Sequence, residues 1–183
     1  NFDDAQSAVK RIFTDKELEQ ELDAKGFRFS SANSINIGRL VPQIVYYFWA
    51  YLNAVKLGEI KAGEELNFTV PTGNFGNILA AYYAKEMGLP VKKLICASNS
   101  NSVLTEFLTT GVYNRNREFF TTISPSMDIL ISSNLERLLY HLTDGNDKKT
   151  AEWMKALNEK GEYTVDAIVA NKVKELFAAY CCG

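Results

Sequence analysis

The order of secondary-structure elements between residues 66 and 110 constrains the fold of this chain more than any other feature. Leu66–Val70 is a short run of strand-forming residues, and residues 78–87 have the apolar pattern of a helix. Lys92–Ala97 is a second apolar strand, followed by a polar loop and a helical pattern over residues 103–109. Parallel neighbouring strands need a crossover helix between them. This order therefore predicts an α/β fold, a parallel sheet with helices on both faces.

The rest of the chain reads mainly as helices. Residues 36–57 carry the longest helical pattern, and its aromatic side chains fall nearly all round, which predicts a well-buried helix. Pro42 lies inside this pattern and should kink the helix or mark its true first turn. Further helices are predicted over residues 3–15, 15–22, 134–142, 147–159 and 166–180, with a short strand at 27–30, a brief extended piece at 163–165 and an irregular stretch at 112–128.

The composition is that of an ordinary globular protein with one domain. The 183 residues are 46% hydrophobic and 23% charged, and their net charge is −2. This balance gives no excess of positive charge that would favour binding to nucleic acid or to an anionic membrane. No apolar run reaches the length of a membrane span. We expect residues 1–183 to be one domain, an incomplete portion of a larger catalytic domain, with a subdomain boundary near residue 145. The oligomeric state is left open.

The cysteines indicate a reducing compartment. Three cysteines are too few for a disulfide framework, and their positions give no metal-ligand spacing. We therefore expect no metal and a cytoplasmic location. The first residue is Asn1, and no basic start followed by an apolar stretch is present, so we expect an internal piece of a longer protein rather than a signal peptide.

The loop Gly73-Asn74-Phe75-Gly76-Asn77 joins a predicted parallel strand to a helix, which is where ligands bind in open parallel sheets. A helix N-terminus has unpaired N–H groups that attract phosphate. The two glycines should let the backbone approach an anion and adopt positive φ, and Asn74 and Asn77 could add amide donors. The loop lacks the Lys and Ser/Thr of a P-loop, so nucleotide hydrolysis is not expected. Glycines at such turns also occur for purely geometric reasons.

Several stretches resemble the fungal and bacterial type of threonine synthase. The most specific is Ser31-Ala32-Asn33-Ser34-Ile35-Asn36-Ile37-Gly38-Arg39-Leu40, followed by Gln43-Ile44 and the aromatic Tyr46-Tyr47-Phe48. Val70–Asn77 resembles the family's phosphate loop, and Leu89–Lys93 with Ala97–Asn99 resembles the strand and loop that follow it. The opening Phe2–Gln6 also fits. The resemblance extends from Phe2 to about Asp128.

The resemblance implies a fold-type-II enzyme, similar to the β-subunit of tryptophan synthase, that depends on pyridoxal 5′-phosphate. Such an enzyme is a carbon–oxygen lyase acting on phosphates, which converts O-phosphohomoserine and water to threonine and phosphate. Gly73, Asn74, Phe75, Gly76 and Asn77 would hold the cofactor phosphate. The small-molecule substrate would be the main partner.

The same resemblance implies substrate contacts from Asn33, Ser34, Asn36 and Arg39. These short donors precede a helix N-terminus, and Arg39 can form a bidentate pair with a phosphate. Spacing alone allows a simpler interpretation, in which Ser34 or Asn36 caps the long helix and Arg39 is solvated.

One departure from the family concerns catalysis. The family's Schiff-base lysine lies in a Phe-Lys-Asp motif upstream of the region matched here, and this sequence contains no such motif. We therefore expect no catalytic residue within the chain and no activity from the 183 residues alone.

Two alternatives stay open: another fold-type-II lyase of the threonine dehydratase or cysteine synthase type, or a non-enzymatic module that binds a phosphometabolite. Among the remaining residues, His141 reads as structural. The resemblance allows Ser124–Asp128 to line the site, because the matching family region approaches the cofactor, but the Ser-Pro start favours an ordinary turn.

Overall fold

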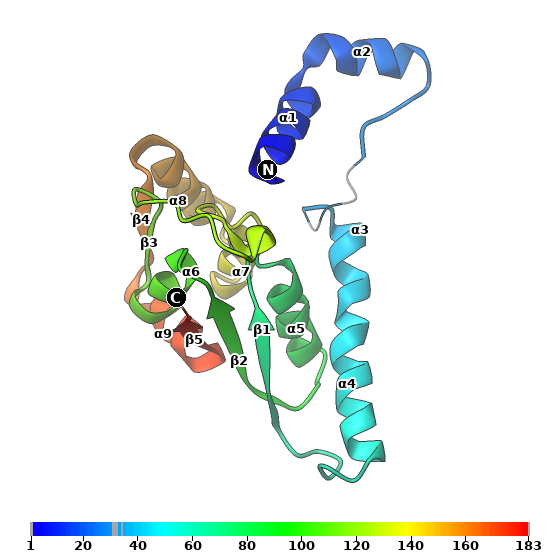
Figure 1. Cartoon of the computed structure of the whole chain (residues 1–183), viewed down its shortest axis with the longest axis vertical. Helices are drawn as coiled ribbons and strands as arrows, with labels where there is room; N and C mark the ends of the chain where they lie inside the picture. The colour runs from blue at the N-terminus through cyan, green and yellow to red at the C-terminus, as the bar shows by residue number, and fades with distance from the viewer. Residues whose placement is uncertain (1, 31–32, 34, 183) are drawn as a thin grey trace.

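The structure is a computed structural model that describes residues 2–30, 33 and 35–182. Helices and strands alternate over most of this length (Figure 1). The elements are α1 (Phe2–Thr14), α2 (Lys16–Ala24), α3 (Ile37–Leu40), the 3₁₀ turn η1 (Val41–Gln43), α4 (Ile44–Lys56), β1 (Leu66–Pro71), α5 (Gly76–Glu86), β2 (Val91–Ser98), α6 (Val103–Thr110), β3 (Val112–Asn114), the 3₁₀ turn η2 (Pro125–Met127), α7 (Leu135–Leu142), α8 (Asp147–Lys160), β4 (Glu162–Thr164), α9 (Ala167–Leu176) and β5 (Phe177–Cys181).

A parallel sheet of order β1-β2-β5 forms the centre of the molecule. Pro71 of β1 pairs with Ala97 of β2, and Ser98 of β2 pairs with Cys181 of β5. The carboxyl ends of the three strands therefore meet at one edge of the sheet. Helix α5 is the crossover between β1 and β2, as the order of elements predicts. The α/β fold with a parallel sheet is confirmed.

Helix α5 is the most deeply buried helix of the described residues. Ile78, Leu79, Ala80 and Ala81 are each 0% exposed, because the helix contacts β1, β2, α4 and α7. Its small alanines allow these neighbours to approach closely. The hydrophobic core continues through Leu94 and Cys96 of β2 to the helices of the C-terminal half.

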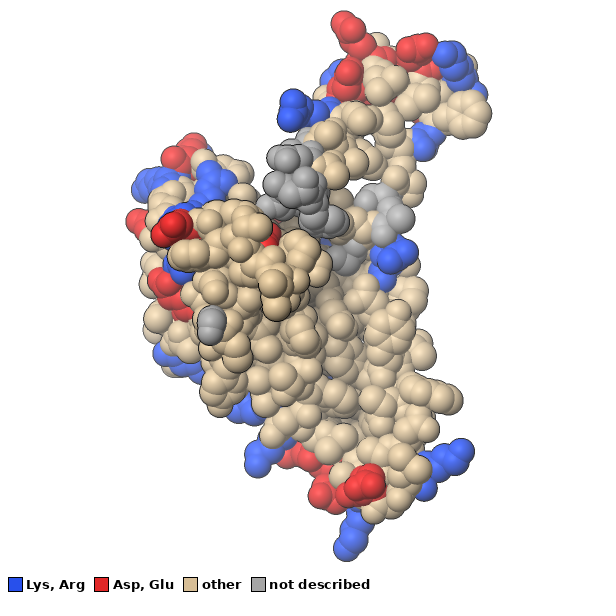
Figure 2. Space-filling view, viewed as in Figure 1, with Lys and Arg blue, Asp and Glu red and all other residues tan. Residues whose placement is uncertain are grey.

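Helix α4 is buried on one side only. Residues 37–56 run as α3, η1 and α4, and Pro42 lies in the 3₁₀ turn before α4, as its missing N–H favours. Tyr47 and Tyr51 are buried, whereas large apolar side chains on the opposite side are exposed, among them Trp49 at 69%. The prediction of a well-buried helix is therefore wrong for that side. Figure 2 shows an uncharged face along α4.

The C-terminal segment differs from the prediction of one long helix. Helix α9 ends at Leu176, and Phe177–Cys181 is a strand that pairs with β2. The alanines of this segment favour a helix locally, but pairing with a buried parallel strand outweighs that preference. The predicted strand at residues 27–30 is wrong as well, because it has no partner strand among the described residues and carries no strand geometry. An isolated extended segment is not stable without such pairing.

Short elements complete the fold. The extended piece predicted at residues 163–165 is β4, and it pairs antiparallel with β3, which falls in the stretch predicted to be irregular.

Near the N-terminus, Asp15 caps α2 by accepting hydrogen bonds from Glu17 and Leu18 N–H groups. Helices α1 and α2 extend away from the sheet in Figure 1.

Candidate cofactor-phosphate site

The glycine loop lies at the carboxyl end of β1 and forms one wall of a cavity of about 230 Å³. The loop lines it together with Gln43, which precedes α4, and Ser126 of η2. The complete lining is Gln43, Pro71, Thr72, Gly73, Asn74, Phe75, Gly76, Asn77 and Ser126. All five predicted loop residues are thus brought to one cavity at the edge of the sheet where ligands bind in parallel α/β folds.

Phe75, not a glycine, has the left-handed backbone conformation in this loop. Its φ is 65° and its ψ is 0°, whereas neither Gly73 nor Gly76 has a positive φ. The expectation that the glycines adopt positive φ is therefore wrong. The conformation costs a residue with a Cβ about 1–2 kcal/mol. The Phe75 ring offsets this cost because it is 1% exposed and packs 5.7 Å from the Phe177 ring.

Gly73 is required for close approach. A Cβ at this position would lie 2.9 Å from the backbone oxygen of Ser126, so no side chain fits without movement of the backbone. The sequence pattern favours an ordinary turn for Ser124–Asp128, yet the structure packs this turn directly against the loop. The packing of Ser126 on a glycine could not be read from the spacing of either segment.

Two hydrogen bonds bind the carbonyls of Gly73 and Asn74 to side chains that do not line the cavity. Ser132 Oγ donates to the Gly73 carbonyl at 3.1 Å, and Asn134 Nδ2 donates to the Asn74 carbonyl at 2.9 Å. The carbonyl and N–H of one trans peptide point in opposite directions. The N–H groups of Asn74 and Phe75 therefore point away from Ser132 and Asn134. Neither Ser132 nor Asn134 was identified from the sequence.

The start of α5 adds the field of a helix N-terminus. Phe75 occupies the N-cap position and makes no side-chain capping hydrogen bond. Such an end presents backbone N–H donors and a partial positive charge to an anion. The loop and this helix end together present several neutral donors and no carboxylate, which fits a phosphate dianion.

Tyr47 of α4 orients the side chain of Asn77. Its hydroxyl donates to Asn77 Oδ1 at 2.7 Å and lies 3.0 Å from the Asn77 carbonyl. Because the amide oxygen of Asn77 is held in this way, the Nδ2 donor is directed to the other side. Burial raises the pKa of Tyr47, so the hydroxyl stays a donor at neutral pH.

A buried carboxylate fixes the η2 turn next to the loop. Asp128 Oδ1 accepts from Asn99 Nδ2 at 2.7 Å and from Asn101 Nδ2 at 3.1 Å, and Oδ2 accepts from Thr122 N–H at 2.8 Å. Desolvation raises the pKa of Asp128, but these hydrogen bonds outweigh it and hold that pKa below its ordinary value. The two asparagines follow β2, so the carboxyl end of β2 anchors the turn that carries Ser126.

Of the predicted substrate residues, Asn33 and Asn36 lie before α3, and Arg39 lies within it. Asn36 caps this helix by accepting from Gly38 N–H at 2.9 Å, and Asn33 Oδ1 accepts from Ile35 N–H at 3.2 Å. Arg39 is exposed, and its carbonyl accepts from Gln43, which lines the cavity. Arg39 thus lies one helical turn before Gln43 in the wall of the loop cavity. Ser34 lies outside the described residues.

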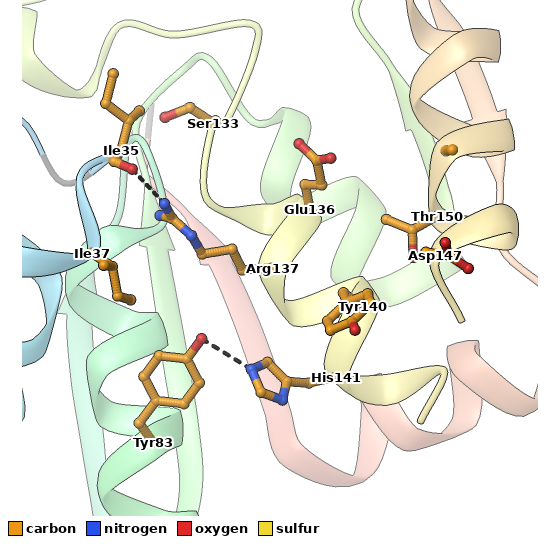
Figure 3. A pocket seen from close by; sticks show the side chains of 11 residues that line it. Ile35, Ile37, Tyr83, Ser133, Glu136, Arg137, Tyr140, His141, Asp147 and Thr150 are labelled. Carbon is orange, nitrogen blue, oxygen red and sulfur yellow. Dashed lines mark hydrogen bonds between the residues drawn. The ribbon is translucent and has the colours of Figure 1, made fainter. Parts of the chain in front are cut away.

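A second, larger cavity of about 650 Å³ lies beside α7 (Figure 3). His141 accepts from or donates to the Tyr83 hydroxyl there at 3.1 Å, which agrees with a structural histidine. The glycine loop does not line this cavity. Within the residues that the structure describes, no group of His, Cys, Asp and Glu side chains could hold a metal ion.

Known proteins that resemble this chain share its fold. No family model matches the sequence. The human protein "Threonine synthase-like 1" is 46% identical and covers 100% of this chain, and the threonine synthase of the yeast Saccharomyces cerevisiae is 40% identical and covers 97%. The crystal structure of threonine synthase with bound PLP from Brucella melitensis superposes with a TM-score of 0.85 at 42% identity, and covers 99% of this chain.

The fold and its match to these solved structures therefore define a part of a fold-type-II pyridoxal-phosphate enzyme. Within that class, the chain is homologous over its whole length to a partial region of the threonine synthases. It spans only 25% of the human relative, 35% of the yeast relative and 37% of the Brucella melitensis chain.

Proposed function

We propose that this chain forms the cofactor-phosphate site and part of the substrate site of an enzyme that converts O-phosphohomoserine and water to threonine and phosphate. One observation carries the proposal. The loop Gly73–Asn77 and the N-terminus of α5 line one cavity, and the carbonyls of Gly73 and Asn74 are bound by Ser132 and Asn134, which do not line that cavity. This donor set fits the phosphate of pyridoxal phosphate, which the homologous structure from Brucella melitensis contains.

The proposal assigns different residues to the cofactor phosphate and to the substrate. Gly73, Asn74, Phe75 and Gly76 would bind the phosphate through the backbone, and Asn77 through its side-chain amide. Bound in this way, the cofactor supplies an electron sink that stabilises carbanions of the amino-acid substrate. We propose that Asn33, Ser34, Asn36 and Arg39 contact the substrate, because Arg39 lies one helical turn before Gln43 in the cavity wall and Asn36 caps the short helix that carries Arg39.

We propose that the 183 residues hold the cofactor without a covalent bond. The sequence has no Phe-Lys-Asp motif. Several lysines have other partners: Lys93 donates to the carbonyls of Lys174 and Glu175, and Lys149 pairs with Asp166. A single domain spanning residues 1–183, with a subdomain boundary near residue 145, also remains our proposal.

A cytoplasmic location is part of the proposal. Cys96, Cys181 and Cys182 are free thiols, as in a reducing compartment. None of the helices in the described ranges is long and apolar enough to cross a membrane.

Binding of pyridoxal phosphate tests the site directly. Titration of the chain, followed by the amide resonances of residues 73–77, should give saturable shifts. Pyridoxal, which lacks the phosphate, should bind at least about tenfold more weakly, because it loses the charge-assisted hydrogen bonds. Equal affinities for the two compounds, or shifts confined to other residues, would refute the phosphate site.

A further inference from the structure

Arg137 of α7 connects two segments that the chain keeps far apart. Its guanidinium donates to the carbonyl of Ile35, as Figure 3 shows, and to Oδ1 of Asn134. Ile35 belongs to the predicted substrate segment. Asn134 lies at the start of α7 and is 0% exposed. The half-buried arginine therefore bridges the substrate segment and a fully buried amide.

Asn134 continues this connection to the glycine loop. Its Nδ2 donates to the Asn74 carbonyl at 2.9 Å, and its backbone N–H donates to the same oxygen at 3.1 Å. A guanidinium has donors only, so the Asn134 oxygen must face Arg137 and the NH₂ group must face Asn74. The arginine thereby fixes the orientation of the amide that holds the loop.

We propose that Arg137 is a positioning residue that couples the substrate segment to the phosphate loop through Asn134. The order is Ile35 carbonyl, Arg137, Asn134, Asn74 carbonyl, and the last carbonyl sets the direction of the Phe75 N–H. A shift of the Ile35 carbonyl moves the guanidinium, and with it the amide that orients this donor. Hydrogen bonds in such a chain also polarise one another. The functional meaning of the coupling rests on the proposed function, but its structural basis does not.

Coupling of this kind is reciprocal. A ligand at the glycine loop must affect the substrate segment as strongly as the segment affects the loop. Pyridoxal phosphate binding should therefore shift the amide resonances of Ile37 and Gly38 in the wild-type chain. A residue that only supported folding would not transmit this shift.

Two variants separately break the link from Ile35 to Asn134 and the link from Asn134 to Asn74. Arg137→Gln removes the guanidinium that donates to both Ile35 and Asn134. Asn134→Asp keeps an acceptor for Arg137 but replaces the NH₂ donor to Asn74 by a carboxylate oxygen. Tyr83→Phe is the matched control, because it removes a hydrogen bond in the same cavity that reaches neither the segment nor the loop.

The test is a double-mutant cycle on the dissociation constant of pyridoxal phosphate. Each single variant should weaken binding about fivefold or more, the lower end of typical coupling. The double variant should weaken it no further, because links in series are lost together. Tyr83→Phe should leave the affinity unchanged. Additive losses, or binding that still shifts Ile37 and Gly38 in Arg137→Gln, would overturn the proposal.

Spectra without ligand separate this proposal from the proposed function. Arg137→Gln should shift the Asn74 and Phe75 amides, and Asn134→Asp should shift those of Asn36 and Gly38. If pyridoxal phosphate fails to bind the wild type, the proposed function fails, and these shifts still decide the coupling. If these shifts are absent in both variants, the coupling through Arg137 is contradicted. Arg137→Lys keeps the positive charge but lacks the two-pronged guanidinium, and it replaces Arg137→Gln if Arg137→Gln does not fold.

Discussion

Gly73 and Phe75 show how the loop depends on single residues. Gly73 allows the turn that carries Ser126 to lie against the loop, and Phe75 holds a left-handed backbone conformation through its buried ring. One position thus has no room for a Cβ, and the other uses its side chain to stabilise an unfavourable backbone.

Replacement of Gly73 by alanine should disable the phosphate site. The added Cβ would lie 2.9 Å from the Ser126 carbonyl oxygen, so the loop or the turn must move. We expect a loss of about 1–3 kcal/mol in the free energy of unfolding and at least about tenfold weaker binding of pyridoxal phosphate. Urea denaturation and the amide titration measure the two effects.

Gly58→Ala provides the matched control. Gly58 has a φ of 78°, and a Cβ added there would meet nothing within 4 Å, so the variant is destabilised by about 1 kcal/mol through its backbone alone. Its affinity should equal that of the wild type. Weaker binding by Gly58→Ala would show that general destabilisation, and not the loop contact, lowers the affinity.

Asp128 should make the stability of the chain depend on acid pH. The pKa of its carboxyl lies below the ordinary value of 3.8, so the unfolded state binds a proton first as the pH falls. The stabilisation is present above that ordinary value and is lost as the pH falls through the lower pKa of the folded state. Urea denaturation between pH 7 and pH 3 should therefore show a smaller loss of stability for Asp128→Asn than for the wild type. An identical loss in both proteins would contradict this role.

At the level of single residues, the sequence reveals the loop but not its supports. Gly73 and Asn77 are recognisable because they follow a strand and open a helix. Ser132 and Asn134 lie about 60 residues further along, in a stretch with no distinctive pattern, and hold the loop only after the chain has folded. The left-handed Phe75 could not be anticipated either, because its stability comes from packing on Phe177.

The elements of the sheet illustrate the competition between local preference and pairing. Strands β1 and β2 have apolar strand patterns, and their predicted bounds lie close to the observed ones. Strand β5 has the sequence Phe177-Ala-Ala-Tyr-Cys181, whose alanines suit a helix, and it becomes a strand because β2 offers a parallel edge. Its existence depends on contacts that a local pattern does not contain.

Phe177→Ala tests the importance of the start of β5. The side chain is 3% exposed and packs against Phe75, so its removal should cost about 3–5 kcal/mol in the free energy of unfolding. Tyr180→Ala on the same strand is the control, since Tyr180 is 62% exposed and should cost about 0.5 kcal/mol or less. Urea denaturation compares them, and similar losses would argue against a buried β5.

For the molecule as a whole, the uncharged face of α4 is the most conspicuous surface. Residues 40–55 contain no Asp, Glu, Lys or Arg, and the exposed side chains include Val45 at 62%, Trp49 at 69% and Leu52 at 59%. Exposed apolar patches of this kind are uncommon on soluble monomers. The helical pattern is visible in the sequence, but the side of α4 that stays exposed depends on which neighbours the chain provides.

We expect this face to make the 183-residue chain self-associate with increasing concentration. Trp49→Glu combined with Leu52→Lys places charges on the face and should shift the chain to monomer in analytical ultracentrifugation. Lys56→Glu, at the end of α4 and outside the uncharged stretch, should leave association unchanged. Equal association of all three proteins would place the contact elsewhere.

The hydrogen bonds that Ser132 and Asn134 make to the loop carbonyls affect the heat-capacity change of phosphate binding. Ser132 and Asn134 fix two carbonyls of the loop within the folded chain, so its N–H donors are oriented before any anion arrives. Little of the backbone needs to become ordered when phosphate binds, and little apolar surface is buried. Calorimetry should therefore record a heat-capacity change near zero for inorganic phosphate, whereas a loop that folds around its ligand would give a clearly negative value.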